Sequence, residues 1–313
     1  MKREPVLRSS TFIIAALVAA CASPPATDTT HAASAASAHK LGETVGMRAP
    51  ESVRYDAELD VYYVSNINGN PSQKDNNGFI VRVRADNTTA TSILVEGGQN
   101  GITLNAPKGM ALHGDTLFVA DIDVLRMFDR TSGKSLGSMD LASMEAVFLN
   151  DVAMGPDGVY ITDTGIRFDE TGTMTHPGTN MIFRVAGKKA NVVVSGDSLM
   201  NPNGLTWDAA GKRWLLAPFG GPNIQSLTPG KWYPATVATG PGGYDGIEVL
   251  PSGTILVSSW ADSTIYQIPL GGSTLLPLVK NVSGPADIGV DTRRNVAAIP
   301  RFQDGKIEYY QIP

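Results

Sequence analysis

Short apolar runs separated by polar turns dominate this chain from about residue 40 onward. Strand-like runs at residues 61–64, 116–119 and 159–162 alternate with turn signals such as Pro156-Asp157-Gly158. No long segment shows the 3.6-residue periodicity of an amphipathic helix. The hydrophobic pattern therefore predicts an all-β domain.

One four-residue pattern recurs six times, and each copy runs into an apolar strand, a polar turn and a second apolar strand. The copies begin at Pro50, Pro107, Leu149, Pro202, Tyr244 and Pro285. They follow one another at intervals near 40 residues, and two of the intervals are longer. A period of this length with about four strands per copy is typical of a β-propeller. We predict a propeller of six blades.

The end of the chain supplies a test of ring closure. After Ala286 there is room for only three strands, so the last blade lacks its fourth. The segment from His39 to Met47 precedes the first copy and can supply it. Pairing the two chain ends in one blade would close the ring and remove exposed sheet edges.

The N-terminus has the features of a processing signal. Lys2, Arg3 and Arg8 precede an apolar stretch at residues 11–20 that is much shorter than the ~20 residues of a membrane-spanning helix. Small residues then lead to Cys21, the single cysteine, in a pattern that resembles a bacterial lipobox. We predict a lipoprotein signal peptide at residues 1–20 and lipidation at Cys21. An ordinary secretory peptide with an incidental cysteine is the alternative.

Residues 21–40 are rich in Ala, Ser, Thr and Pro and cannot form a core, so we predict a disordered tether followed by a propeller at residues 41–313. By the resemblance to bacterial lipoproteins, Ala22 after the cysteine would favour the outer membrane and a location in the bacterial periplasm. The chain carries a net charge of −5, which argues against a nucleic-acid partner. We expect a monomer that meets the membrane only through its lipid.

The second residue of each repeat carries the candidate chemistry. In a propeller these positions lie at the start of the innermost strands and converge at one mouth of the central channel. Four of the six offer hard oxygen ligands: Glu51, Asn150, Asn203 and Asp245. That set suits one divalent cation, Ca²⁺ first, with Mg²⁺, Mn²⁺ or Zn²⁺ as alternatives. The competing interpretation is that these side chains only cap turns.

The other two equivalent positions are Lys108 and Ala286. Lys108 could pair with Glu51 or Asp245, bind an acidic substrate or an oxyanion, or extend out of the channel towards solvent. The two longer intervals come from insertions at residues 66–78 and 163–180, which we expect to project over the same mouth. Phe219, Trp260, Arg301 and Phe302 follow second strands and should form the rim.

Several motifs resemble those of the senescence marker protein/gluconolactonase family, which includes regucalcin. Pro202-Asn203-Gly204-Leu205-Thr206-Trp207 resembles its Pro-Asn-Gly-Leu/Ile-x-Trp motif, and Asn150-Asp151 with Pro156-Asp157-Gly158 is similar to its Pro-Asn-Asp segment. Asp245-Gly246 and Glu51 match two further family positions. Ser52-Val53 departs from the usual Gly-Pro. The resemblance covers the whole folded part and implies a six-bladed propeller with one divalent cation.

By that resemblance, Glu51, Asn203 and Asp245 would bind the cation directly, and Asn150 would bind the cation or the substrate. The implied reaction is hydrolysis of a lactone or other cyclic ester, with a small lactone or sugar-acid-like molecule as substrate. We expect catalytic roles for Asp245 as general base, Asn150 in orienting the substrate and Lys108. The alternative is a non-catalytic lipoprotein that serves as a ligand-binding or protein-interaction scaffold.

Overall fold

The computed structural model describes Met1 and residues 38–313. The predicted signal peptide, Cys21 and the tether as far as residue 37 lie outside the described residues, Met1 excepted. Within the described part, no helix has the length and apolar character needed to span a membrane.

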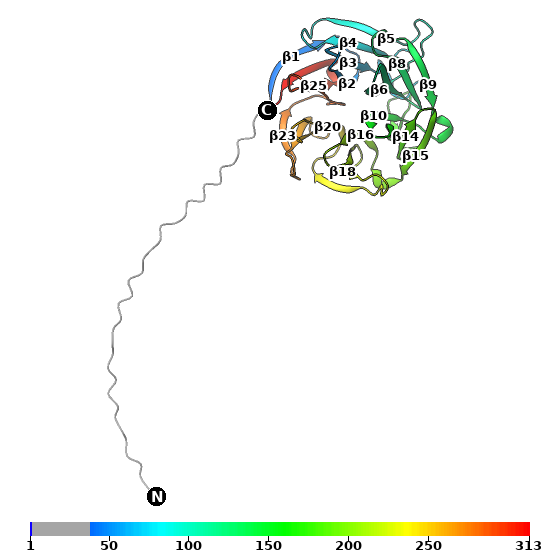
Figure 1. Ribbon diagram of the computed structural model, residues 1–313. Helices are drawn as coiled ribbons and strands as arrows, with labels where there is room; N and C mark the ends of the chain where they lie inside the picture. Colours follow the sequence, from blue (N-terminus) through cyan, green and yellow to red (C-terminus); the bar gives the residue numbers. More distant parts are fainter. Residues whose placement is uncertain (2–37) are drawn as a thin grey trace. The chain divides into compact units, whose positions relative to one another are not determined.

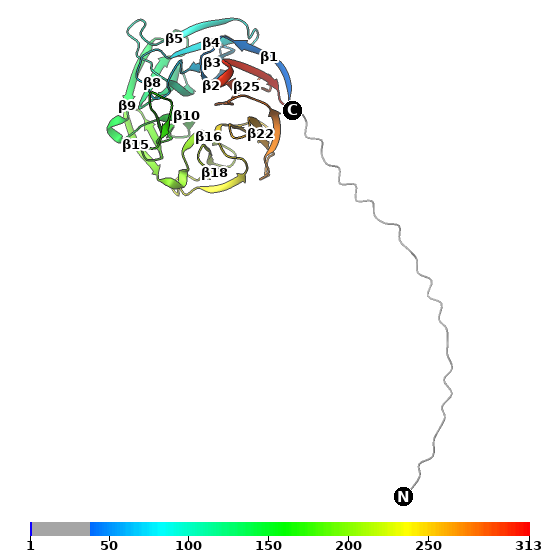
Figure 2. The same cartoon turned by 180° about the vertical axis from the view of Figure 1, so that it is seen from behind.

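Six four-stranded antiparallel sheets form a ring in the described part of the chain, and they follow one another around it in sequence order (Figure 1); Figure 2 shows the same ring from behind. The predicted six-bladed β-propeller is confirmed. Blades one to three are β2 (Pro50–Asp56), β3 (Val61–Asn66), β4 (Phe79–Arg84), β5 (Thr91–Glu96); β6 (Pro107–His113), β7 (Thr116–Asp121), β8 (Val124–Asp129), β9 (Ser135–Asp140); and β10 (Leu149–Gly155), β11 (Gly158–Asp163), β14 (Met181–Ala186), β15 (Lys189–Ser195).

Blades four to six are β16 (Pro202–Asp208), β17 (Arg213–Pro218), β18 (Asn223–Leu227), β19 (Ala235–Thr239); β20 (Tyr244–Val249), β21 (Ile255–Ser259), β22 (Thr264–Ile268), β23 (Leu276–Lys280); and β24 (Gly289–Asp291), β25 (Val296–Arg301), β26 (Lys306–Gln311), β1 (His39–Val45). A two-stranded hairpin, β12 (Arg167–Phe168) and β13 (Met174–Thr175), stands between β11 and β14. The 3₁₀ helices of the described part are η1 (Ala142–Met144), η2 (Asp197–Leu199) and η3 (Phe302–Asp304).

The two chain ends meet in the sixth blade. β1 pairs antiparallel with β26, from His39 opposite Gln311 to Val45 opposite Lys306. In Figure 1 the blue β1 lies beside the red strands of this blade. Since β1 starts at His39, the folded part begins at least two residues before the expected boundary at residue 41.

The hydrophobic core is divided among the blade interfaces, with one cluster between each pair of neighbouring blades. Between blades three and four the rings of Tyr160 and Trp214 lie 4.3 Å apart, and Trp207 packs at 5.2 Å from Trp214. Because both faces of each sheet are covered, inner strands such as β3 are buried at every position, whereas the outer strand β9 is largely exposed. Both tryptophans pack at the interface between these two blades.

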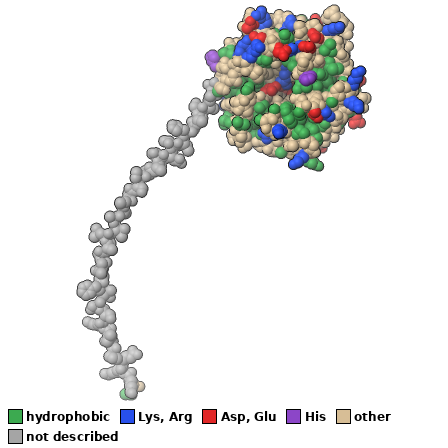
Figure 3. Space-filling view, viewed as in Figure 1, with side chains coloured by type: hydrophobic (Ala, Val, Ile, Leu, Met, Phe, Trp, Pro, Cys, Tyr) green, Lys and Arg blue, Asp and Glu red, His purple; other side chains and the backbone are tan. Residues whose placement is uncertain are grey.

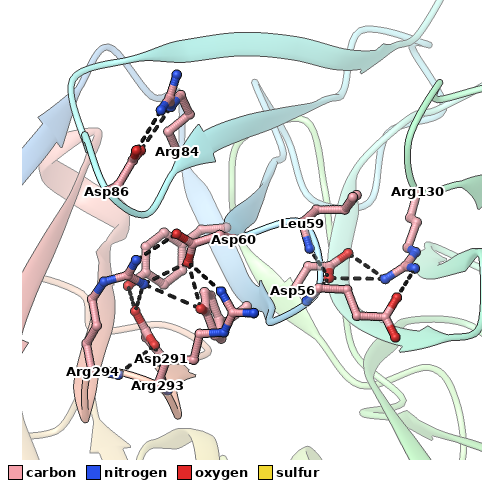
Figure 4. A network of polar contacts seen from close by, with 12 residues as sticks. Asp56, Leu59, Asp60, Arg84, Asp86, Arg130, Asp291, Arg293 and Arg294 are labelled. Atoms are coloured by element: carbon pink, nitrogen blue, oxygen red, sulfur yellow. Dashed lines mark hydrogen bonds and ion pairs between the residues drawn. The ribbon is translucent and has the colours of Figure 1, made fainter.

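Ion pairs join the first blade to its neighbours at the end of β2 that lies away from its start (Figure 4). Arg130 from blade two pairs with Asp56 at 2.9 Å, and Arg294 from blade six pairs with Asp60 at 2.6 Å. Arg294 also pairs with Asp291 at 2.7 Å. These contacts join the first blade to the second and to the sixth. The face seen in Figure 3 carries basic and acidic side chains mixed with hydrophobic ones.

Candidate functional site

A β-bulge stands at the start of five innermost strands. In β2, Pro50 pairs with Asn66 and Val53 with Val64, so one extra residue lies in the inner strand. The same shift occurs in β6, β10, β16 and β20. A bulge changes the direction of the side chains it contains. The bulged segments hold the residues that the repeat singled out: Glu51, Lys108, Asn150, Asn203 and Asp245.

Hydroxyl side chains from second strands hold these bulges in place. The backbone N–H of Asp151 donates to Thr162 Oγ1 at 2.9 Å, and that hydroxyl donates to the carbonyl oxygen of Asn203 at 2.8 Å. Ser258 makes the same pair of hydrogen bonds two blades further on, from β21. Each hydroxyl therefore links the bulge of one blade to the candidate residue of the next, which fixes their relative positions.

The four residues predicted to hold a cation line one cavity of about 240 Å³ at the mouth of the channel. Their exposed fractions are 5 to 6%, so the side chains are almost completely withdrawn from solvent. They come from four different blades: Glu51 on β2, Asn150 on β10, Asn203 on β16 and Asp245 on β20.

Two carboxylate oxygens in this cavity have no hydrogen-bond partner among the described residues, Glu51 Oε2 and Asp245 Oδ1. The other oxygen of Asp245, Oδ2, accepts a hydrogen bond from Trp260 Nε1 at 2.8 Å. Buried acceptors without partners are costly, so native structures usually satisfy them with a donor, water or an ion. No three His, Cys, Asp or Glu side chains of the described part cluster as a metal site would. A cation here would therefore also need the amide oxygens of Asn150 and Asn203.

The pKa values of Glu51 and Asp245 are raised, because both acids are buried and neither forms an ion pair among the described residues of the cavity. Burial, and then the negative charge of Asp245, raise the pKa of Glu51 well above its usual range, while Lys108 acts in the opposite direction. Burial and the charge of Asp287 likewise raise the pKa of Asp245, against the hydrogen bond from Trp260. A bound cation would relieve this cost by favouring both ionised forms.

Asn150 is held by the hydroxyl of the residue that directly follows β11, the second strand of its own blade. Its Nδ2 donates to Thr164 Oγ1 at 3.0 Å, and Thr164 donates in turn to the carbonyl oxygen of Pro202 at 2.9 Å. This chain fixes the amide plane, with the nitrogen engaged by Thr164.

Lys108 is buried and connects the second blade to the first insertion. Its Nζ donates to the carbonyl oxygens of Pro71 and Ala106, both at 3.0 Å, and lies 4.2 Å from the ring centre of Phe148. Burial lowers its pKa to about 8, although the charge of Glu51 favours the protonated form. The side chain does not extend into solvent, and it makes no ion pair within 4 Å among the described residues. It fastens a loop above the cavity.

A second group of charged residues lies around the axis next to these bulges. Arg54 contacts Asp151 at 3.1 Å and Asp287 at 3.0 Å, and its Nη1 pairs with Glu248. Asp287 also accepts a hydrogen bond from Ser52 Oγ at 2.6 Å. Arg54 thus joins acids from three other blades.

Sequence reasoning missed Arg54 and Glu248. One signal was present: Arg54 and Glu248 each stand three residues after a candidate position, Glu51 and Asp245. Asp151 joins this group to the next blade, because its Oδ2 accepts the backbone N–H of Leu205 at 2.7 Å while Oδ1 binds Arg54.

The rim prediction holds for three of four residues. Phe219, Trp260 and Phe302 line the cavity, and Trp260 contacts both of the other rings. Arg301 does not line it. Its guanidinium pairs with Asp304 at 2.6 Å and Glu308 at 3.2 Å, since those acids follow it in η3 and β26.

Both insertions lie over the mouth, as the blade pattern predicts, and they contact each other. Asn70 Nδ2 donates to the carbonyl oxygen of Asp169 at 2.7 Å, and the N–H of Phe168 donates to Ser72 Oγ at 2.9 Å. Pro71 from the first insertion and Phe168 from the second are among the residues that line the cavity. The two insertions form a joined lid.

The fold and this site define a class of protein. It is a six-bladed β-propeller with a cavity at one mouth of its channel, which has carboxylate and amide side chains at its floor and two joined loops above it. No known family model matches the chain, and no curated protein matches it.

Two solved structures resemble the fold. A luciferin-regenerating enzyme is 12% identical with a TM-score of 0.64, covering 87% of this chain and 94% of that one. A chain from a nidogen/laminin complex is 18% identical with a TM-score of 0.54, covering 71% and 76%. At these identities the likeness shows a common fold, which hosts an enzyme in one neighbour and a member of a protein complex in the other.

Proposed function

We propose that this chain is a metal-dependent hydrolase of the gluconolactonase type, which opens a lactone or other cyclic ester. One observation carries the proposal: Glu51 and Asp245, which line the cavity together with Asn150 and Asn203, each keep a buried carboxylate oxygen without a partner. Two carboxylates and two amide oxygens are a donor set suited to Ca²⁺ or another hard divalent cation. When bound, such a cation would polarise the ester carbonyl as a Lewis acid.

The residues of the chain would divide the remaining work. Asp245 is the general-base candidate, because Trp260 holds its Oδ2 while Oδ1 has no protein partner, and a carboxylate that holds the cation can still accept a proton from a water molecule beside it. Asn150, fixed by Thr164, would orient the substrate. Lys108 would act by holding the lid and by its positive charge, since two of its N–H donors are engaged by Pro71 and Ala106.

The metal requirement is tested by comparing chelator-treated protein with protein reloaded with Ca²⁺, Mg²⁺, Mn²⁺ or Zn²⁺ on a panel of lactones. We expect hydrolysis only after reloading. Equal rates before and after reloading would exclude the metal mechanism. Binding of lactones without turnover in any metal form would favour the scaffold alternative.

The ligand set is tested by calorimetric titration of the cation into the Asn203→Ala variant. We expect loss of measurable binding, because one of four protein oxygens is removed from a site with few charges. Asn191→Ala, at an exposed position on β15, is the matched control and should bind as the parent does. Undiminished binding in Asn203→Ala would disprove the assignment.

A further inference from the structure

The cavity at the mouth has a polar floor and an apolar wall. The floor consists of the candidate residues on the innermost strands. Above it stand aromatic side chains from two directions. Phe148 and Phe168 come from blade three and its insertion, with ring centres 5.9 Å apart. Phe219, Trp260 and Phe302 come from blades four, five and six. Blade three lies opposite blade six in the ring of six blades. The polar floor therefore lies between two groups of aromatic side chains.

The lid adds to the apolar wall. Ile67 belongs to the first insertion and Ile166 and Met174 to the second, and all three line the cavity. Met174 stands on the hairpin strand β13. The parts of the two insertions that reach the cavity therefore present hydrocarbon and thioether surface to a ligand.

Most hydrogen-bonding groups that reach the wall are already engaged, and Lys108 keeps one of its three N–H donors. Trp260 Nε1 donates to Asp245, and Lys108 Nζ donates to two carbonyl oxygens. Thr164 Oγ1 accepts from Asn150 and donates to Pro202. Among the described side chains that line the cavity, the buried polar atoms without a partner are Glu51 Oε2 and Asp245 Oδ1, and both belong to the floor.

This distribution separates two kinds of cyclic ester. The ring hydroxyls of a sugar-acid lactone would lose water and find engaged donors or aromatic carbon, at a cost of about 1–3 kcal/mol for each unpaired group. An alkyl or aryl substituent would instead gain about 0.8 kcal/mol per buried methylene, which is about fourfold in affinity. The wall thus favours an apolar substituent and disfavours a polyol.

We infer that the substrate class of this site is a small cyclic ester that carries its carbonyl group to the floor and an alkyl or aryl substituent to the aromatic wall and lid. The inference rests on the proposed function. The volume of about 240 Å³ lies below the ~300–1,000 Å³ of sites for drug-sized ligands, so the substituent is short.

The test uses binding as well as turnover. Cyclopentanones bearing methyl, butyl or hexyl groups present a ring carbonyl that cannot be hydrolysed, and their affinity for the Ca²⁺-loaded full chain is measured by calorimetry. We expect affinity to rise about fourfold per methylene until the cavity is full. A flat series, or tighter binding of a polyhydroxylated lactone, would overturn the inference.

Parallel hydrolysis assays with the matching alkyl lactones and with a polyhydroxylated lactone separate the two proposals. If ketone affinity rises with the length of the alkyl group but no lactone is hydrolysed, the hydrolase function is excluded and the inferred ligand class is still supported. Hydrolysis that prefers the polyhydroxylated lactone would support the function and defeat the ligand class.

Phe168→Ser locates the subsite. Phe168 lies on the lid, is only partly buried, and its replacement leaves the blade cores intact. We expect affinity for the hexyl ketone to fall about tenfold and for the methyl ketone less than twofold. Leu270→Ser is the control, because Leu270 is 73% exposed in the turn after β22, and both affinities should stay unchanged. An equal loss for both ketones in Phe168→Ser would contradict the proposed wall.

Discussion

Two groups of buried acids surround the channel, and they differ in how their charge is balanced. In the first, Asp151, Glu248 and Asp287 share Arg54 as a common cation. In the second, Glu51 and Asp245 line the cavity and keep carboxylate oxygens without a partner. Uncompensated buried charge is costly, so a protein usually pairs it or binds an ion. The chain supplies its own cation to one group and leaves the other for an external one.

Lys108 illustrates the difference. It stands at the repeat position equivalent to Glu51 and is the basic side chain of the cavity lining, yet its hydrogen bonds go to the carbonyls of Pro71 and Ala106. Arg54, in contrast, makes direct ion pairs with three acids. The first group is therefore expected to serve stability and the second to serve binding.

The largest effect is expected from removing the internal cation. Arg54→Met should leave three buried carboxylates unpaired and lower the free energy of unfolding by about 3–5 kcal/mol. Urea denaturation measures the change. Arg84→Met removes the exposed pair with Asp86 and serves as the control, with no measurable change expected. If both variants unfold alike, the Arg54 group does not carry stability.

The second group should respond to an added cation. Ca²⁺ at 100 times its dissociation constant should raise the free energy of unfolding by about 2.7 kcal/mol, because only the folded state binds it. Glu51→Gln should abolish this gain and, in cation-free buffer, should unfold no more easily than the parent, since it removes a buried charge. A Glu51→Gln variant that keeps the full calcium-induced gain would show that the carboxylate is not a ligand.

The repeat was sufficient to predict the blade number and the convergence of Glu51, Asn150, Asn203 and Asp245. Because the repeats share one register around the ring, their equivalent residues lie at the same mouth of the channel. This convergence can be predicted without knowing how the side chains pack. Arg54 and Glu248 were missed because side chains alternate between the two faces of a regular strand. Residues three positions apart, such as Glu51 and Arg54, are then expected on opposite faces. The bulge in both of these inner strands adds one residue and brings side chains three positions apart to the same face, and nothing in the sequence marks it plainly.

Side-chain contacts within single blades were the other limit of sequence reasoning. Trp260 was expected only at the rim, but its indole N–H also binds Asp245 from the neighbouring strand. Arg301 was expected at the rim and turns away, because two acids that follow it in the chain lie within reach. Such choices depend on rotamers and on competing partners, which spacing alone does not determine.

A smaller effect is expected where Lys108 fastens the lid. Lys108→Met should leave the carbonyl oxygens of Pro71 and Ala106 without their donor, at a local cost of about 1–3 kcal/mol. Amide hydrogen exchange should accelerate in residues 66–78. Lys74→Met, which removes a more exposed pair between the same insertion and Asp123, should have less effect. Unchanged exchange in Lys108→Met would mean that the lid is held by other contacts.

The smallest effect is a pH dependence within the Arg54 group. Burial raises the pKa of Glu248 to about 7 from its ordinary value of 4.5, against the charge of Arg54. The folded state then binds the proton more tightly than the unfolded state, so this contribution to stability is complete below pH 4.5 and is lost as the pH rises towards 7. Because the side chain keeps 21% of its surface exposed, we expect a loss on the order of 1 kcal/mol across that window. Glu248→Gln should flatten the curve of unfolding free energy between pH 4.5 and 7, as measured by urea denaturation. Parallel curves for parent and variant would show that Arg54 keeps Glu248 ionised throughout, which would make the charge balance of the first group more complete than its burial indicates.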